Sequence, residues 1–547
     1  MAWLNEFATK GFVEQISALS KISKEKDFNA LPALFSIYRK PIGDKPVDAM
    51  VEHTLRDLLN ENETQTVAKI VSGTPKEQKL CLGIARIKKF ASVVPVLDEL
   101  VKKERNREIL QATFLTMGEL GDRHFLDIFR GHLTDNDEII AAICIEMVGV
   151  FRDEESLPQL QTIIDNAEKI RLYKECKLET SKAILAIRAI GNETAISYLV
   201  SKLHHKNPTA RRIIHDMLVE FGEVVIPWLD KIFQTEDTSM LIMATNVLGR
   251  IGSRNAGNSI VTALELENTR HPNVRFAIYE ALGFIVSSKG LIALLDGLAE
   301  SDGLTLRAVL TSLELQFNPH AGKRIAEVIA EDDPQGQNII HTIISVKALN
   351  IFTYLYNTDK TTARKLLAVL QLSKDNDILS AFVKRLEAIG SESTVEDVKK
   401  LTLLLNTKSK GPRVLAVDDS ISMLSYYRSV CTNMALEIVT AENGKEAWYK
   451  MENGHANFFN LIIVDMNMPV MDGIELTKKI RASSIWNKIP IIMATTESDK
   501  SQVRLAKQSG VDEFIIKPMT PVVLEKKIKK MLELKEEVKE KDLPINA

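Results

Sequence analysis

Acidic, hydroxyl and amine side chains follow four short apolar runs near the C-terminal end of the chain. In order along the sequence, the residues at these positions are Asp418 with Asp419, then Asp465, Thr495 and Lys517. Three carboxylates, a hydroxyl and an ammonium are groups that bind a hard divalent cation and an anionic oxygen ligand. A single aspartate after an apolar run is more often a turn or cap residue, so a chemical role depends on all four runs together.

Each apolar run has the length and composition of a buried strand, and parallel strands would bring the polar residues to one edge of one sheet. Three close carboxylates raise one another's pKa unless a divalent cation neutralises them, and Mg²⁺ prefers oxygen ligands of this kind. Beside such a cation, Asp465 would attack a phosphoryl group and form an aspartyl phosphate. Lys517 and Thr495 would then bond phosphoryl oxygens.

These motifs resemble the receiver domain of two-component response regulators, in both order and spacing. The matching residues are Asp418-Asp419, Asp465 with Met468-Pro469 and Asp472-Gly473, Thr495, and Lys517-Pro518. The resemblance covers residues 411–535, roughly a quarter of the chain. It implies an α/β flavodoxin-like (βα)5 fold, and the sequence alternates accordingly. We expect strands to end near Val417, Ala441, Val464, Thr495 and Ile516, and helices to begin near Ser420, Gly444, Ile474, Lys500 and Pro521.

The resemblance also implies the roles of the acidic residues. Asp465 would be the phosphoacceptor. Mg²⁺ would be held by Asp418, Asp419, Asp465 and the backbone carbonyl of Asn467.

Other residues are implied to recognise the phosphoryl group and transmit its presence. Thr495 and Lys517 would bond it, and Phe514 matches the switch position, whose ring turns inward when the threonine moves. We expect the face containing Phe514 to meet either the helical repeats or their partner. The sequence departs from the family pattern at Thr496, where a smaller residue is usual, and at Met519, where an aromatic residue is common.

The lifetime of the phosphoryl group in this family depends on the residues two after the phosphoacceptor and two after the threonine. Here these are Asn467 and Glu497, a pair similar to that of the chemotaxis single-domain receivers. We therefore expect rapid autodephosphorylation, with Thr496 acting as a brake.

The rest of the chain is helical in character and repeats at a fixed interval. An aliphatic-Pro-x-Leu pattern places Pro32, Pro95, Pro158 and Pro227 at separations of 63, 63 and 69 residues, about twice the length of a helical repeat. Proline suits the first turn of a helix, and glycine suits its end. The helix-ending glycines are expected at positions 121, 191, 222, 252 and 283.

His271 to Gly283 resembles a HEAT-type repeat, and about ten such repeats fit between residues 28 and 405. The helical hairpins must stack to bury their apolar faces, which predicts a curved α-solenoid that binds proteins. His204, His205 and His215 are more typical of packed helix positions than of metal ligands.

Composition excludes several classes of function. A formal charge of −3 gives no basic field for nucleic acid. No apolar run reaches the roughly 18 residues that a membrane span needs. Cys81, Cys144, Cys176 and Cys431 are far apart in sequence, as expected of reduced thiols. We expect a cytoplasmic protein.

The sequence therefore predicts an all-α HEAT-like solenoid at 1–405, a linker at 406–412, a receiver domain at 413–535 and a charged tail at 536–547. Asp465 would be phosphorylated by a sensor histidine kinase or a phosphotransfer protein. The solenoid would be a protein-binding output or docking scaffold, for a partner that the sequence does not name.

Two alternatives remain at this point. The receiver could be a phosphate sink that drains a kinase, or the solenoid could act on a small molecule, as in HEAT-like proteins that resemble bilin lyases. No acid, histidine or cysteine cluster recurs on one repeat face. We therefore expect no enzymatic activity beyond phosphoacceptor chemistry and autodephosphorylation.

Overall fold

The computed structural model describes residues 7–541, apart from residues 8, 170–175, 332, 374, 406–410, 455–457 and 496–506. The predicted linker at 406–412 and the predicted helix start at Lys500 therefore fall largely or wholly outside the described residues. The chain forms two compact units. One comprises Met1–Asn166 with Lys177–Ala195, and the other comprises Ala167–Cys176 with Ile196–Ala547.

The first unit is built from antiparallel helices joined by short connections. In chain order, its helices are α2 (Phe12–Glu25), α3 (Leu31–Arg39), α4 (Lys45–Leu59), α5 (Glu63–Ser72), α6 (Pro75–Lys88), α7 (Val94–Lys103), α8 (Arg107–Leu120), α9 (Leu126–Gly131), α10 (Glu138–Val150), α11 (Leu157–Glu168) and α12 (Leu178–Ile190). The next helix, α13 (Glu193–Ser201), begins in the first unit and ends in the second.

The second unit continues the repeats and adds a parallel sheet. Its solenoid helices are α14 (Pro208–Phe221), α15 (Ile226–Ile232), α16 (Thr238–Ile251), α17 (Arg254–Ala263), α18 (Pro272–Gly283), α19 (Ser288–Asp296), α20 (Gly303–Leu315), α21 (Pro319–Ala330), α22 (Pro334–Ser345), α23 (Leu349–Thr358), α24 (Lys360–Leu372), α25 (Asn376–Ile389) and α26 (Glu392–Leu404). Even-numbered helices pack side by side in one layer, and odd-numbered helices form the second layer. The stacked layers are the solenoid predicted from the repeats.

The predicted proline positions are confirmed. Pro32, Pro95, Pro158 and Pro227 lie in the first turns of α3, α7, α11 and α15. In that turn the missing N–H of proline has no intrahelical partner to lose. The repeat period read from the prolines is thus the period of the second helix in each pair.

The predicted glycine caps are confirmed at three positions. Gly121, Gly191 and Gly252 follow α8, α12 and α16 in the left-handed conformation, with φ of 65°, 65° and 68°. Gly222 follows α14 with φ 63° but ψ −136°, which is outside the left-handed helical region.

The prediction of a left-handed cap at Gly283 is wrong. Gly283 is the last residue of α18 and does not have a positive φ. A Cβ there would lie 2.4 Å from Oγ of Ser312 in α20. Gly249 is equally close to the next helix, because its Cβ would lie 2.8 Å from that of Ala281. These glycines let successive solenoid helices approach closely.

The receiver domain is a five-stranded parallel sheet with strand order β2-β1-β3-β4-β5. Its strands are β1 (Arg413–Val417), β2 (Glu437–Ala441), β3 (Leu461–Asp465), β4 (Ile491–Thr495) and β5 (Glu513–Ile516), and its helices with described bounds are α27 (Ile421–Asn433), α28 (Gly444–Glu452), α29 (Gly473–Ala482) and α31 (Pro521–Lys541). This confirms the flavodoxin-like fold. α31 extends past residue 535, where the sequence suggested that the receiver domain ends.

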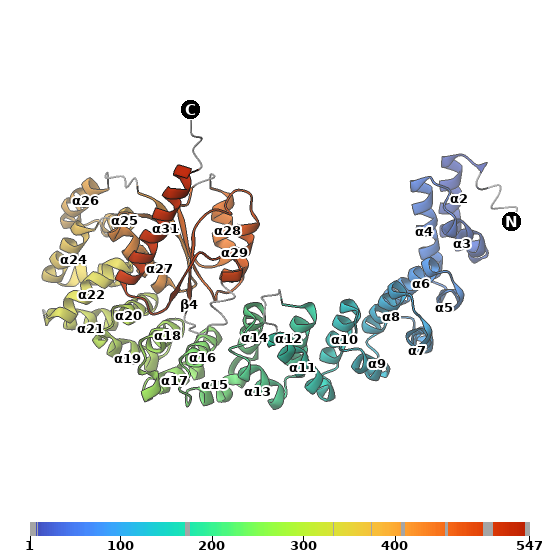
Figure 1. Ribbon diagram of the computed structural model, residues 1–547, viewed down its shortest axis with the longest axis horizontal. Coiled ribbons are helices and arrows are strands. Elements are labelled where there is room, and N and C mark those ends of the chain that lie inside the picture. Colours follow the sequence, from blue (N-terminus) through green and yellow to red (C-terminus); the bar gives the residue numbers. More distant parts are fainter. Residues whose placement is uncertain are drawn as a thin grey trace. The chain divides into compact units, whose positions relative to one another are not determined.

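The two faces of the sheet are covered by different helices, as Figure 1 shows. One apolar cluster joins the sheet to α27 and α31, and the other joins it to α28 and α29. Phe276 and Leu304 of the solenoid pack against the first cluster. The receiver therefore lies against the inner side of the green and yellow helices in Figure 1, with α27 next to α20 and α22.

Candidate functional site

The carboxyl ends of β1, β3 and β5 bring two aspartates and a lysine together. Nζ of Lys517 lies 2.6 Å from Oδ1 of Asp465 and 2.7 Å from Oδ2 of Asp418. Asp418 and Asp465 are only 1% and 5% exposed. Because these parallel strands are in register, the predicted convergence of their polar ends is realised in the structure.

Backbone amides fix the two aspartates in place. The N–H of Asn467 donates to Oδ2 of Asp465 at 2.9 Å, and the N–H of Ser420 donates to Oδ1 of Asp418 at 3.1 Å. The hydroxyl of Tyr427 also donates to Oδ2 of Asp418, at 3.2 Å. These bonds fix the positions of the two carboxylates at the sheet edge.

The turn after Asp465 depends on a glycine. A Cβ at Gly473 would lie 2.1 Å from the backbone carbonyl oxygen of Asp465, which leaves no room for a larger residue. Asp472 caps α29 by accepting a hydrogen bond from the N–H of Glu475 at 2.8 Å. Asp472 and Gly473 thus allow the chain to turn from the end of β3, which carries Asp465, into α29.

Thr495 ends β4 and is fully buried. Its carbonyl accepts a hydrogen bond from the N–H of Lys517 at 2.7 Å, which ties the ends of β4 and β5 together. Its hydroxyl lies 3.8 Å from the sulfur of Met466, the residue after Asp465. Thr495 is therefore beside the Asp465 loop, where the sequence predicted a hydroxyl for the phosphoryl group.

Burial and mutual repulsion shift the pKa values of the acidic residues. Burial raises the pKa of Asp465 to about 6, against the opposing effect of Lys517. The side chain of Asp419 is exposed to the neighbouring cavity, but desolvation by the surrounding protein and the charges of Asp465 and Asp418 raise its pKa well above its usual range. Burial alone would lower the pKa of Lys517, but the two carboxylates that it bonds hold it well above its usual value. The site therefore carries more negative charge than one lysine neutralises.

By donor type and net charge, this set of residues fits Mg²⁺. Three carboxylates against one ammonium leave two negative charges, and all the donors are oxygens. Asp419 is exposed to the cavity beside the site. Among the described residues no three acidic or histidine side chains converge as a ligand shell, because Asp418 and Asp465 bond Lys517 instead. Asp419 is thus the carboxylate of the set that is exposed to the cavity.

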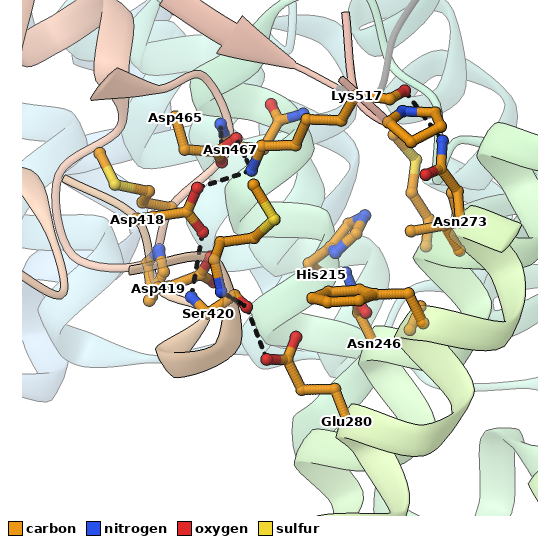
Figure 2. A pocket seen from close by; sticks show the side chains of 18 of the residues that line it. His215, Asn246, Asn273, Glu280, Asp418, Asp419, Ser420, Asp465, Asn467 and Lys517 are labelled. Atoms are coloured by element: carbon orange, nitrogen blue, oxygen red, sulfur yellow. Dashed lines mark hydrogen bonds and ion pairs between the residues drawn. The ribbon is translucent and has the colours of Figure 1, made fainter. Parts of the chain in front are cut away.

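A cavity of about 190 Å³ separates Asp465 from the solenoid. Figure 2 shows its two walls, with Asp465, Asn467 and Lys517 on the receiver side and His215, Asn246 and Glu280 on solenoid helices. The cavity is also lined by the apolar side chains Ile242, Met243, Phe276, Leu304 and Met423. The predicted phosphoacceptor therefore faces the solenoid across a partly open cavity.

Three solenoid side chains bond site residues or residues two positions from them. Nη2 of Arg211 donates to Oδ1 of Asn467 at 2.6 Å, and Nδ2 of Asn273 donates to the carbonyl of Lys517 at 2.8 Å.

The third is Glu280, whose Oε1 accepts a hydrogen bond from the hydroxyl of Ser420 at 2.6 Å. Sequence reasoning missed all three contacts. The bonded pairs are 256, 244 and 140 residues apart, so no local motif could have indicated them.

Glu280 adds a fourth carboxylate to the neighbourhood of the acid cluster. Burial and the charge of Asp418 raise its pKa to about 7, against the opposing effects of the hydrogen bond from Ser420 and the charge of Lys517. A carboxyl group whose pKa is raised in this way favours the docked arrangement when it is protonated. The charges of Asp418 and Lys517 therefore act on this contact between the solenoid and the receiver as well as on the site.

The histidines of α14 and its approach do not form a metal site. His205 is fully buried, and its Nδ1 accepts a hydrogen bond from the N–H of Asn207 at 3.0 Å. Nε2 of His215 bonds the carbonyl of Leu203 at 3.3 Å, and burial lowers the pKa of His215 to about 4. These side chains hold the backbone of the solenoid, in agreement with the packing role expected for them.

The predicted switch residue lies away from the contact with the solenoid. Phe514 is partly buried against the apolar cluster of α28 and α29. Among the described residues, the hydrogen bonds and ion pairs between solenoid and receiver involve α27, the start of α29 and the loops after β1, β3 and β5. Of the two alternatives expected for the Phe514 face, these contacts do not support the one in which it meets the helical repeats, and the one in which it meets their partner stays a prediction. Thr496 and Glu497, expected to tune the lifetime of the phosphoryl group, lie outside the described residues.

Comparison with protein-family models finds two matches. A response regulator receiver domain matches residues 414–529, and HEAT repeats match residues 226–314. These assign the two parts of the chain as the sequence motifs predicted. No helix within the described ranges has the length and apolar character needed to cross a membrane.

Individual proteins match the receiver part over nearly their whole length. The chemotaxis protein CheY1 of Helicobacter pylori is 40% identical over 121 residues, which are 22% of this chain and 96% of that protein. A chemotaxis protein CheY homolog of Campylobacter jejuni is 39% identical over 121 residues, which are 22% of this chain and 92% of that protein. A crystal structure of the chemotaxis protein CheY4 of Vibrio cholerae matches at 36% identity and a TM-score of 0.21, covering 22% of this chain and 99% of that one.

Proposed function

We propose that this chain, which belongs to the response regulator family through its CheY-like receiver domain, accepts a phosphoryl group on Asp465. The donor would be a sensor histidine kinase or a phosphotransfer protein, and the place of action the cytoplasm. The HEAT-like solenoid would be the output or docking scaffold that responds to the modification.

One observation carries the proposal. A buried carboxylate at a strand end is bonded by Lys517 at 2.6 Å, and a second carboxylate bonds the same ammonium at 2.7 Å. Oδ1 of Asp465 is thus beside a positive charge that would meet the phosphoryl oxygens as they arrive. A fixed cation aimed at developing negative charge is a principal means of stabilising such a transfer.

The reaction exchanges one bond to phosphorus for another. An oxygen of the Asp465 carboxylate forms a bond to phosphorus, and the bond between phosphorus and the imidazole nitrogen of the donor breaks. Lys517 would bond one oxygen of the transferred group, and Thr495 would donate its hydroxyl to another. Mg²⁺, when bound by Asp418, Asp419, Asp465 and the carbonyl of Asn467, would neutralise charge on the phosphoryl oxygens.

The scaffold role is supported by where the solenoid touches the receiver. Arg211 bonds Asn467, two residues after Asp465, and Glu280 bonds Ser420, two residues after Asp418. Asn273 bonds the backbone carbonyl of Lys517 itself. A phosphoryl dianion on Asp465 would change the charge of the cavity that these side chains line. The proposal includes no enzymatic reaction of the solenoid, only phosphoacceptor chemistry and autodephosphorylation.

Incubation with acetyl phosphate and Mg²⁺ should add one phosphoryl group to the wild-type chain, as measured by intact mass. Asp465→Ala should take up none, because the nucleophilic carboxylate is absent. Asp512→Ala is the matched control, since Asp512 is an exposed aspartate that pairs with Arg481 on the receiver surface. It should be modified like the wild type. Equal modification of Asp465→Ala and the wild type would refute the assignment.

A further inference from the structure

Arg211 is a solenoid residue that reaches the candidate site. It lies in α14, is 3% exposed and donates from Nη2 to Oδ1 of Asn467 at 2.6 Å. A second bond, from Nη1 to the carbonyl of His205 at 3.3 Å, fixes the guanidinium on the solenoid. A planar guanidinium with two anchored donors is held in one orientation.

Asn467 connects this arginine to the phosphoacceptor. It is two residues after Asp465, and its N–H donates to Oδ2 of Asp465 at 2.9 Å. Figure 2 shows Asn467 beside Asp465 and Lys517 on the wall of the cavity. The orientation of its carboxamide therefore decides which polar group a water molecule near Asp465 meets.

Loss of the phosphoryl group requires such a water molecule. Its oxygen forms a bond to phosphorus as the bond between phosphorus and the Asp465 oxygen breaks, and the electron pair of that bond leaves with the carboxylate. The proton of the water passes to solvent or to the released phosphate. An adjacent hydrogen-bond acceptor that orients the water makes this attack faster.

Arg211 holds one such acceptor, the carboxamide oxygen of Asn467, away from this water molecule. The carboxamide oxygen of Asn467 is engaged by the guanidinium in a charge-assisted hydrogen bond, which turns it toward α14. We propose that Arg211 is a positioning residue that slows hydrolysis of the aspartyl phosphate while the solenoid is docked. The inference rests on the proposed function and gives the solenoid control over the lifetime of the modification.

The test measures how fast the full chain loses its phosphoryl group. Each variant is phosphorylated with acetyl phosphate and Mg²⁺, the donor is removed, and the remaining modified fraction is followed by intact mass. Arg211→Ala should shorten the half-life by about tenfold, the change that one charge-assisted hydrogen bond can produce.

Arg212→Ala is the matched control. Arg212 is the next residue of α14 and also contacts the receiver, through the carbonyl of Val470 at 2.9 Å and Glu475 at 3.2 Å. Arg212 does not bond Asn467 in the described structure, so the half-life of the phosphoryl group in Arg212→Ala should stay near that of the wild type. Equal shortening in both variants would show a general loss of docking and would overturn the role of Arg211.

A double-mutant cycle separates positioning from a structural effect. In an Asn467→Ala chain the carboxamide is absent, so adding Arg211→Ala should cause no further change in half-life. A further shortening there would overturn the inference. Arg211→Lys, which keeps the charge but not the fork of donors, should give an intermediate half-life, and it decides the question if Arg211→Ala does not fold.

Different results would overturn the proposed function and the inference on Arg211. A wild-type chain that takes up no phosphoryl group overturns the proposed function and this inference with it. A chain that is phosphorylated on Asp465 but has the same half-life with and without Arg211 overturns this inference alone.

Discussion

Replacing Lys517 with alanine should slow phosphoryl transfer to Asp465 by about a hundredfold or more, because a fixed donor to the developing charge is lost. The same change should lower the stability of the metal-free chain. Lys517 bonds two carboxylates and is 11% exposed, and removing one member of a buried ion pair costs about 3–5 kcal/mol. Acetyl phosphate labelling and thermal unfolding measure the two effects.

The stability effect should depend on pH with a definite sign. Lys517 opposes the burial that raises the pKa of Asp465, so without Lys517 that pKa rises above its value of about 6. A carboxyl group whose pKa is raised by folding destabilises the fold once it is ionised, so stability falls as pH rises through that value. The deficit of Lys517→Ala should therefore be larger at pH 8 than at pH 5.

Lys530→Ala is the control for this prediction. Lys530 pairs with Glu513 at 2.8 Å on the receiver surface and is 60% exposed, so its loss should change stability by less than about 1 kcal/mol. It should leave the labelling rate unaltered. Wild-type labelling and an unchanged melting temperature in Lys517→Ala would contradict the site as described.

Reversing the charge of Arg428 should release the receiver from the solenoid. Arg428 lies in α27, is 12% exposed, and its Nη1 is 3.0 Å from Oδ2 of Asp377 and 3.9 Å from Oδ2 of Asp375 at the start of α25. Arg428→Glu would put a third carboxylate beside these two. The loss of attraction and the new repulsion amount to about 3–5 kcal/mol, enough to shift a docking equilibrium by roughly two to four decades.

Small-angle X-ray scattering should then show a larger radius of gyration. Lys347→Glu is the matched control, because Lys347 pairs with the same Asp377 at 2.9 Å but belongs to the solenoid. Its scattering should resemble that of the wild type. Adding Asp377→Lys to Arg428→Glu should restore the compact form. A compact Arg428→Glu chain would mean that this ion pair does not hold the domains together.

The chemistry of the site could be predicted from the sequence because it depends on local sequence patterns. Asp465 and Lys517 follow buried parallel strands, and the sheet alone places such residues at one edge. The solenoid was readable for a similar reason, because Pro95 and Gly121 mark helix starts and ends wherever the helices go.

What the sequence did not indicate depends on packing between distant segments. Gly283 looks like a helix cap in sequence, yet its role is to let α18 approach Ser312 of α20. Asn273 belongs to the stretch that resembles a HEAT-type repeat, and its bond to Lys517 joins residues 244 positions apart. The hydrogen bond from the hydroxyl of Ser425 in α27 to the carbonyl of Ser345 likewise joins residues 80 positions apart, so no local pattern indicated that the solenoid covers this helix.

The central claim is that phosphorylation of Asp465 is sensed by the solenoid. Hydrogen–deuterium exchange of the full chain, with and without beryllofluoride and Mg²⁺, tests it most directly. The account predicts altered exchange in α14 and α18, which bond the site loops, and unaltered exchange in α21, which has no such bond among the described residues. Asp465→Ala should show no change. Exchange in α14 and α18 that is identical with and without the phosphoryl mimic, in a chain shown to bind it, would contradict the account and favour a receiver that only drains a kinase.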